Sequence, residues 1–150
     1  MAKTAKKSKS LSAGVIVYDG EKIVIGHATG GRHWDIPKGK IESNEVAIAG
    51  ALRELEEETN FKAQYKDLKF LGIFKYKSDK DLALYLWKID SFPDISTLTC
   101  NSTFVNSKNK ILPEFDKFLY VTFDQAFNKT VPAMKKVLED VEVRLRLIKH

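Results

Sequence analysis

The residues best suited to chemistry in this chain are three glutamates, Glu54, Glu57 and Glu58, in the segment RELEEETNF. On a helix at about 100° per residue, the three side chains fall within roughly a third of the circumference. Carboxylates this close repel at neutral pH unless Arg, Lys or a bound cation compensates. Hard divalent cations prefer oxygen ligands, so the pattern predicts a Mg²⁺ or Mn²⁺ site. A solvated acidic helix face is the alternative meaning of a glutamate run.

The spacing around these glutamates favours the metal site. Gly39 is followed after five residues by Glu45, and after seven more by residues 53–61. This arrangement resembles the box of the Nudix hydrolases, G-x5-E-x7-R-E-U-x-E-E-x-G-U with U apolar, at every defined position except one. Asn60 stands where the family has its last Gly, and Asn is the residue next most tolerant of the left-handed conformation. The resemblance extends more loosely from about residue 11 to residue 140.

The resemblance implies a metal-dependent enzyme that cleaves pyrophosphate linkages, with Mg²⁺ or Mn²⁺ as its cofactor. It assigns Glu57 and Glu58 to the metal, together with the carbonyl oxygen of Gly39. Glu54 is either a further ligand or the base that orients the attacking water. Which glutamate acts as the base, and how many metal ions bind, are left open.

Two further residues are expected to support this chemistry. Arg53 is predicted to pair with Glu45 and so to hold the helix against the preceding loop. Some family members recruit an acidic residue from a loop before the last strand as the general base. Glu114 matches that place, with a simple solvated loop acid as the alternative.

Substrate contacts are predicted at Lys38 and Tyr76. The Pro37-Lys38-Gly39 run resembles the Nudix members that act on nucleoside polyphosphates, diadenosine polyphosphates and RNA caps, which makes Lys38 a candidate phosphate contact. Tyr76 resembles the position that marks diadenosine polyphosphate hydrolases. The small residues Ala47 and Gly50, on the glutamate side of the helix, are expected to leave room for phosphates.

Three functions follow from this resemblance. The leading one is hydrolysis of a nucleoside diphosphate derivative such as ADP-ribose, a diadenosine polyphosphate or FAD. The second is removal of pyrophosphate or a cap from RNA 5′ ends. The third is a non-catalytic nucleotide sensor, although sensors that have lost activity usually lose box carboxylates, and this chain keeps them.

Length and composition bound the class of protein. The chain has 150 residues, of which 43% are hydrophobic and 30% charged, which indicates one globular domain. It shows no apolar run long enough for a membrane span and no signal peptide, so a cytoplasmic protein without a membrane partner is expected. A single cysteine, Cys100, excludes an internal disulfide. The oligomeric state is left open.

Much of the positive charge lies at the N-terminus. The net charge is +5, and four lysines fall in residues 1–10, so 5 minus 4 leaves +1 for residues 11–150. Residues 1–10 are therefore interpreted as a flexible basic tail, with contact to RNA as the alternative, and residues 11–150 as the domain. No basic and aromatic pattern typical of nucleic-acid binding emerges from the rest of the sequence.

The remaining pattern predicts a mixed α/β domain, and the resemblance implies the α/β/α sandwich of the Nudix fold with a mixed central β-sheet. Asp19-Gly20 predicts a hairpin between two apolar segments. Asn44 or Ser43 is expected to cap the glutamate-bearing helix, and Thr130 the last helix. Strands are expected at residues 11–18, 22–28, 61–65, 68–76, 82–89 and 118–123, and helices at residues 47–59 and from residue 132 onward.

Overall fold

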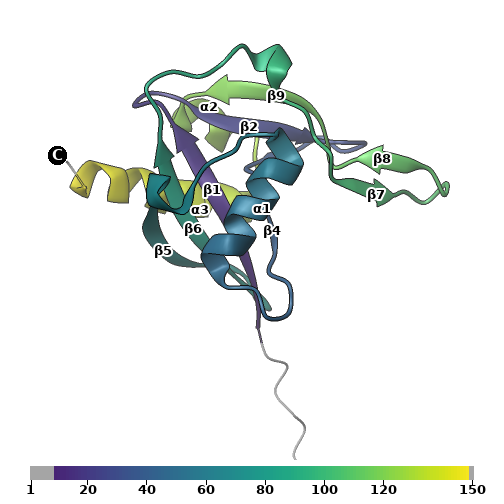
Figure 1. Ribbon diagram of the computed structural model, residues 1–150, viewed down its shortest axis with the longest axis horizontal. Coiled ribbons are helices and arrows are strands. Elements are labelled where there is room, and N and C mark those ends of the chain that lie inside the picture. Colours follow the sequence, from purple (N-terminus) through teal and green to yellow (C-terminus); the bar gives the residue numbers. More distant parts are fainter. Residues whose placement is uncertain (1–8, 149–150) are drawn as a thin grey trace, which may run out of the picture.

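A mixed seven-stranded β-sheet forms the centre of the computed structural model, which describes residues 9–148 (Figure 1). Its strands are β1 (Ser10–Tyr18), β2 (Ile23–Ala28), β3 (Trp34–Asp35), β4 (Lys38–Lys40), β5 (Leu68–Lys77), β6 (Lys80–Lys88) and β9 (Phe115–Val121). Five of them run in the order β3-β2-β1-β6-β5, while β4 pairs with β1 and β9 pairs with β2. Strands β1 and β6 are parallel and the other pairs are antiparallel, so the expected mixed sheet is confirmed.

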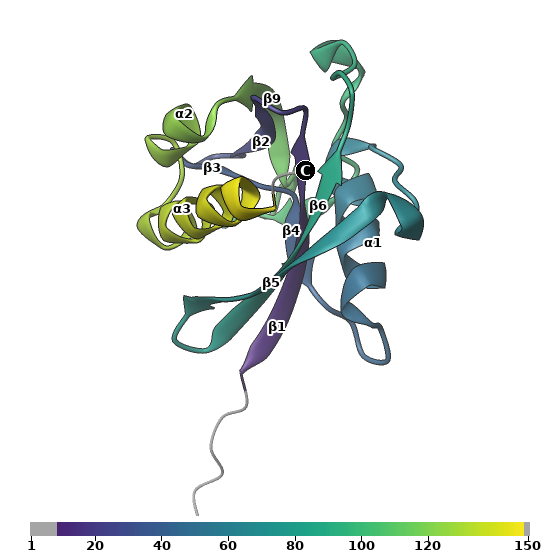
Figure 2. The same ribbon diagram turned by 90° about the vertical axis from the view of Figure 1, so that its left-hand side faces the viewer.

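Helices cover both faces of this sheet. Figure 2 shows α1 (Ala47–Thr59) on one side and α3 (Pro132–Leu147) on the other, with the short α2 (Phe123–Phe127) beside α3. The α/β/α sandwich is therefore confirmed, and α1 occupies the predicted residues 47–59. No helix in the described part of the chain is long and apolar enough to cross a membrane.

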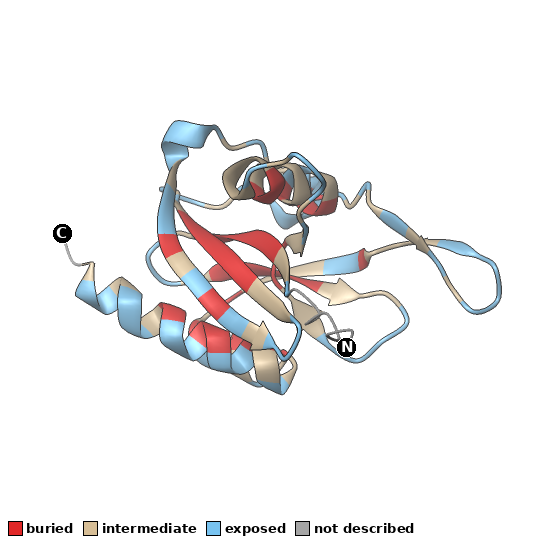
Figure 3. Ribbon diagram, turned by 90° about the horizontal axis from the view of Figure 1, so that it is seen from below, coloured by how far each residue is buried: buried red, intermediate tan, exposed pale blue. Residues whose placement is uncertain are grey.

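The strand β1 sorts its side chains between the two helical layers, because successive residues of a strand point to opposite faces. Val15 and Val17 belong to the apolar cluster that includes Leu55 of α1. Ile16, between them, belongs to the cluster that includes Met134 of α3. Figure 3 shows the resulting buried band along the central strands and the inner side of each helix. Burying each of these side chains stabilises the fold by about 1.5–3 kcal/mol, so α1 is fixed to the sheet by its apolar side.

The hairpin predicted at Asp19-Gly20 is present between β1 and β2. The Asp19 carboxylate accepts the backbone N–H groups of Glu21 at 2.9 Å and Lys22 at 2.7 Å. Gly20 has φ of 105°, which a residue with a side chain rarely adopts. These contacts hold the turn that brings β2 back beside β1.

Both helix caps expected from the sequence are wrong. No described side chain caps α1; Val46 takes the N-cap position, and Asn44 instead forms a turn with φ of 66°. Ser43 provides no cap either. The N-cap position of α3 is Val131, with no side-chain cap, and the Thr130 hydroxyl instead donates to the carbonyl of Ala126 at 3.0 Å, at the end of α2. Tertiary placement, rather than a local side chain, fixes where these two helices begin.

The strand expected at residues 61–65 is also wrong. The Gln64 side chain accepts the backbone N–H of Asp67, and the Asp67 side chain accepts the backbone N–H of Gln64. These two bonds close a short 3-10 helix, η1 (Tyr65–Asp67), so the chain turns before β5 begins. A similar reciprocal pair, Thr122 and Gln125, starts α2, which the sequence analysis did not anticipate. Local side-chain bonds override strand propensity in both places.

A second, two-stranded sheet stands apart from the main one. It consists of β7 (Thr103–Val105) and β8 (Ile111–Pro113), which project from the body as a hairpin (Figure 1). A 3-10 helix, η2 (Ile95–Thr97), precedes it. Of the basic segment predicted at residues 1–10, residues 1–8 lie outside the described residues, and Ser10 already belongs to β1.

Candidate active site

A polar cavity of about 340 Å³ lies where β4, α1 and the start of β9 meet. It gathers residues that the sequence analysis named separately: Glu54 and Glu58 from α1, Lys38 and Gly39 from β4, and Glu114 between β8 and β9. The full lining comprises Ala28, Asp35, Ile36, Lys38, Gly39, Lys40, Glu54, Glu58, Ser102, Glu114 and Phe115. Four carboxylates, those of Asp35, Glu54, Glu58 and Glu114, thus line one cavity from three separate parts of the chain.

Glu58 is the most buried carboxylate of the group, with 7% of the residue exposed. Its Oε1 accepts the backbone N–H of Lys38 at 2.8 Å, which ties the last turn of α1 to β4. Burial raises the pKa of Glu58 to about 9. A carboxyl group kept in so unfavourable an environment is suited to a positively charged ligand, since such a ligand favours the ionised form.

Glu54 lies directly against the backbone of Gly39. A Cβ atom added to Gly39 would overlap the Glu54 carboxylate, so a side chain at this position and the observed carboxylate placement exclude each other. Burial also raises the pKa of Glu54. The requirement for glycine in the box motif is thereby explained by close approach and not by a special backbone angle.

Arg53 organises the outer side of the glutamate cluster. Its Nε and Nη2 donate to the two carboxylate oxygens of Glu45 at 2.8 Å and 3.0 Å, so the predicted pair is confirmed. Its Nη1 donates to Glu54 at 2.9 Å and to Glu57 at 3.2 Å. The hydrogen bond from Arg53 lowers the pKa of Glu45 to about 2. One guanidinium thus balances the repulsion among three carboxylates.

Glu57 stands at the rim and is not part of the cavity lining. Its side chain is 41% exposed and contacts Arg53. Its backbone carbonyl accepts the N–H groups of Asn101 at 2.7 Å and Ser102 at 3.1 Å. These two bonds fix the segment that leads into β7 against the last turn of α1.

Glu114 lies at the end of the β7–β8 hairpin, directly after β8, and lines the cavity. Its N–H donates to the Ser102 carbonyl at 2.8 Å, and its own carbonyl accepts the N–H of Thr29 at 3.1 Å. Glu114 lies in a bend between β8 and β9, as the sequence analysis expected, and backbone bonds on both sides hold its main chain in place. Its neighbour Phe115 is already the first residue of β9.

Lys38 and Tyr76 contact each other, but only Lys38 lines the cavity. The Lys38 ammonium lies 2.8 Å from the Asp35 carboxylate and 5.1 Å from the centre of the Tyr76 ring. Burial alone would lower the pKa of Lys38, but the ion pair with Asp35 raises it. Tyr76 packs against the core on the α3 side of the sheet. Asp35, three residues before Lys38, is a site residue that the sequence analysis did not assign.

The small residues of α1 have a different role from the one expected. A Cβ at Gly50 would lie 2.9 Å from Oε1 of Glu45 and 3.3 Å from Cγ1 of Ile41. Gly50 therefore makes room for the Glu45–Arg53 pair rather than for phosphates. Ala47 packs against the apolar cluster beneath the helix.

The donors around the cavity fit a hard divalent cation in chemical type. Carboxylates of Glu54, Glu58 and Glu114 and backbone oxygens are the ligands that Mg²⁺ and Mn²⁺ prefer. Within residues 9–148, however, no three acidic, His or Cys side chains already converge at metal-binding spacing. The Arg53 guanidinium and the Lys38 backbone amide hold Glu54 and Glu58 in their observed places.

Comparison with known proteins adds a family and a set of relatives. The family model described as the NUDIX domain matches residues 8–141. An uncharacterized 17.7 kDa protein in the e-segB intergenic region of Enterobacteria phage T4 is 34% identical over 146 residues, which cover 90% of this chain and 97% of that protein. The RNA pyrophosphohydrolase of Pelagibacter ubique is 25% identical over 120 residues, covering 77% of this chain and 75% of that protein.

Solved structures agree on the fold. The crystal structure of a C. elegans Ap4A hydrolase binary complex is similar with a TM-score of 0.65 and 18% identity. The similarity covers 93% of this chain and 99% of that chain. This chain therefore shares its fold with that protein over nearly the whole length of both chains.

Proposed function

This chain belongs to the Nudix family of pyrophosphohydrolases, and from that membership we propose that it hydrolyses a phosphoanhydride bond in a nucleotide derivative. The observation that carries the proposal is the convergence of Glu54, Glu58 and Glu114 on one cavity beside Gly39. The residues come from different elements, so their meeting is a property of the fold and not of the sequence motif alone.

We assign Glu57 and Glu58, with the Gly39 carbonyl, to the binding of Mg²⁺ or Mn²⁺, and Glu54 either to the metal or to the attacking water. A divalent cation at such a site neutralises the diphosphate and lowers the pKa of water. Glu58 would bind the ion as a carboxylate, and the Lys38 N–H that its Oε1 accepts at 2.8 Å holds it beside β4. Arg53 keeps Glu54 and Glu57 oriented, and Glu45 keeps Arg53 in place.

Proton transfer falls to one of two carboxylates. Water attacks one phosphorus, the bond from that phosphorus to the bridging oxygen breaks, and the water proton passes to a base. Glu54 and Glu114 both line the cavity and are the candidates. Nη1 of Arg53 donates to Glu54 at 2.9 Å, which holds the Glu54 carboxylate in one place. The backbone bonds of Glu114 suit a base with a fixed position.

The substrate we favour is a nucleoside diphosphate derivative such as a diadenosine polyphosphate, ADP-ribose or FAD. The similarity in fold to an Ap4A hydrolase is compatible with this class. Lys38 supports it because a charged ammonium lies at the cavity wall, balanced by Asp35. Tyr76 contributes through its contact with Lys38 rather than by direct contact with the cavity.

Triphosphorylated or capped RNA 5′ ends are the second candidate. The relative from Pelagibacter ubique carries the name RNA pyrophosphohydrolase. In addition, Lys40 lines the cavity and Arg32 is exposed on the loop before β3, so positive charge flanks the carboxylates. Such charge would attract a substrate with a longer phosphate backbone.

The test is a hydrolysis panel with Mg²⁺ present or chelated. Diadenosine tri- and tetraphosphate, ADP-ribose, FAD, dNTPs and triphosphorylated RNA are incubated with the full chain, and the products are identified by mass. Metal-dependent release of products cut at a phosphoanhydride bond supports the proposal, and the preferred substrate separates the two candidates. Absence of cleavage across the panel would contradict it.

A further inference from the structure

An exposed basic and aromatic surface lies at the C-terminal end of α1. We call it the η1 surface and define it by Lys62, Tyr65 and Lys66, together with Lys69 and Phe70 on the edge strand β5. Phe70 points to the α1 side of the sheet and Lys69 to the α3 side, so the surface wraps around this edge. All five residues are exposed, with Tyr65 at 59% and Phe70 at 54%. Exposed aromatic rings beside lysines suit a partner that carries both negative charge and flat apolar groups.

The charge of this surface is not neutralised internally. Within residues 9–148, no carboxylate forms an ion pair with Lys62, Lys66 or Lys69. The acid inside the segment is Asp67, whose Oδ2 accepts the Gln64 N–H at 2.8 Å. Three lysines against this one carboxylate leave a positive surface that suits an anionic partner.

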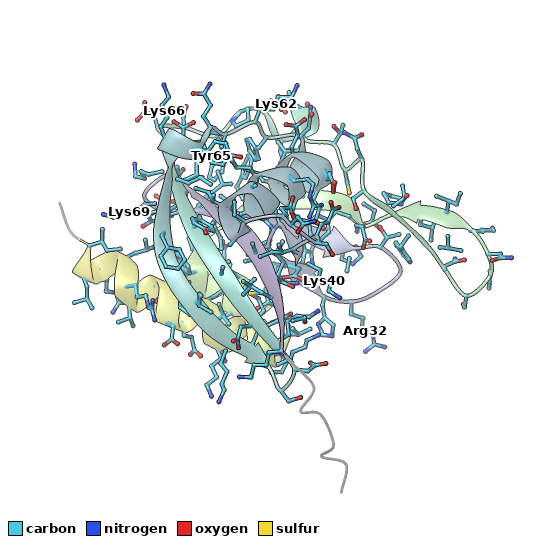
Figure 4. The ribbon with its side chains drawn as sticks, turned by 60° about the horizontal axis from the view of Figure 1, so that its bottom comes forward. Arg32, Lys40, Lys62, Tyr65, Lys66 and Lys69 are labelled. Atoms are coloured by element: carbon cyan, nitrogen blue, oxygen red, sulfur yellow. The ribbon has the colours of Figure 1, made fainter. Side chains whose placement is uncertain are left out.

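The surface lies close to the catalytic glutamates. Lys62 follows Glu58 by four residues, so their Cα atoms are at most about 14 Å apart. Figure 4 shows Lys62, Tyr65 and Lys66 together at one end of α1, with Lys69 beside them on β5. The same view shows Arg32 and Lys40 on the other side of α1. Positive side chains therefore lie on both sides of α1, the helix that carries the glutamates.

On its α3 side the η1 surface borders a groove of mixed charge. This groove, of about 700 Å³, begins at Asp67 and Lys69 and continues toward α3. Besides Lys69, its walls carry the basic residues Lys88 and Arg146, and besides Asp67 the acidic residues Glu21, Asp124 and Glu142. The groove therefore offers no continuous positive path toward α3.

We propose that the η1 surface binds single-stranded nucleic acid, with lysines on its phosphates and Tyr65 and Phe70 against its bases. Stacking on aromatic rings combined with a positively charged path is how proteins hold single strands without reading sequence. A membrane surface fits less well, because η1 has three residues and forms no amphipathic helix. The proposal rests on the proposed function, in that a strand held here would present its 5′ end to the cavity.

Binding is tested with a short labelled single-stranded RNA that carries a 5′-hydroxyl, because this probe has no phosphoanhydride bond to cleave. The variant combines Lys62→Gln, Tyr65→Ser and Lys66→Gln in the full chain. We expect its Kd to rise at least about tenfold. The salt dependence should also become shallower by roughly 1.4 in log–log slope, about 0.7 for each lysine. Tyr65→Phe alone, which keeps a ring, should bind like the parent protein.

The matched control is Lys135→Gln with Lys136→Gln, which removes two exposed lysines from α3. It should leave the Kd for RNA within about twofold. Both variants keep residues 1–8, so any contribution from that segment cancels. Thermal melts and hydrolysis of a small dinucleotide should be unchanged in both, which separates this proposal from the proposed function.

Three results would overturn the proposal. One is an RNA Kd that the triple variant leaves unchanged, and another is an equal loss in the α3 control. The third is binding to anionic lipid vesicles, lost in the triple variant, together with no measurable binding to RNA. If RNA binding depends on the η1 surface while no panel substrate is cleaved, the surface stands and the proposed function fails.

Discussion

Arg53 and Glu45 form a bidentate ion pair, in which Nε of Arg53 lies 2.8 Å from one carboxylate oxygen of Glu45 and Nη2 lies 3.0 Å from the other. The remaining guanidinium nitrogen, Nη1, is directed at Glu54 and Glu57. Glu45 also accepts the N–H of Glu42 at 3.0 Å, which closes the loop before α1. Glu45, which does not line the cavity, therefore sets the orientation of Arg53. Arg53 in turn holds Glu54 and Glu57 by hydrogen bonds.

Replacing Glu45 by Gln should destabilise the protein in a pH-dependent way. The folded-state pKa of Glu45 is about 2, below its ordinary value of 4.5, so its stabilisation is complete above about pH 4.5 and is lost as the pH falls toward 2. At neutral pH, Glu45→Gln should lower the free energy of unfolding by about 1.5 kcal/mol or more. Urea titrations at several pH values should show this difference shrinking on acidification.

Glu42 provides the control for that series. It lies 3.7 Å from Nη1 of Arg53, but its side chain is 68% exposed. Glu42→Gln should change stability by less than about 0.5 kcal/mol at any pH. Equal effects of the two substitutions, or a Glu45→Gln penalty that does not vary with pH, would show that the pair does not act as described.

Gly39→Ala should disturb the site from the β4 side. The added methyl group would overlap the Glu54 carboxylate, so the Glu54 side chain must leave its observed place. We expect an activity loss of at least about tenfold, because a displaced catalytic group loses its alignment, with only a small change in stability. Gly31→Ala is the matched control, because its Cβ would meet the Ala28 carbonyl at an ordinary 3.6 Å. Comparable activity of the two variants would contradict the close-approach explanation.

Asn60 ends α1 in the left-handed conformation, with φ of 69° and ψ of 9°, and its N–H donates to the Glu56 carbonyl at 2.9 Å. Asn60→Gly should be neutral or mildly stabilising, since glycine adopts this conformation without strain. Asn60→Val should cost about 1–2 kcal/mol or more and weaken activation by Mg²⁺, because the strain reaches the last turn of α1. Identical thermal melts and Mg²⁺ titrations for the two variants would exclude this role.

The parts of the site that the sequence predicts are those fixed by local spacing. The helix at residues 47–59, the Arg53–Glu45 pair and the left-handed Asn60 all follow from short-range pattern and are present. Each depends on positions within one helix and the loop before it, where sequence separation determines geometry.

The parts that the sequence does not predict depend on contacts between distant elements. Tyr76 meets the site through Lys38 because β5 and β6 carry it to the α3 side of the sheet, which spacing from the box cannot indicate. Thr130 has the residue type of a cap but bonds to Ala126 instead. The η1 surface emerges only once the reciprocal bonds of Gln64 and Asp67 replace the expected strand with a turn.

The central claim is that the glutamates of α1 bind the cation used in hydrolysis, and neighbouring substitutions test it most directly. Glu57 contacts Arg53 at the cavity rim, whereas Glu56, next to it, is exposed and projects away. Mg²⁺-dependent turnover of the preferred panel substrate should fall at least about a hundredfold in Glu57→Gln, a loss of roughly 3 kcal/mol or more. Glu56→Gln should retain turnover within about twofold. Near-normal turnover by a folded Glu57→Gln protein, or an equal loss in Glu56→Gln, would contradict the account.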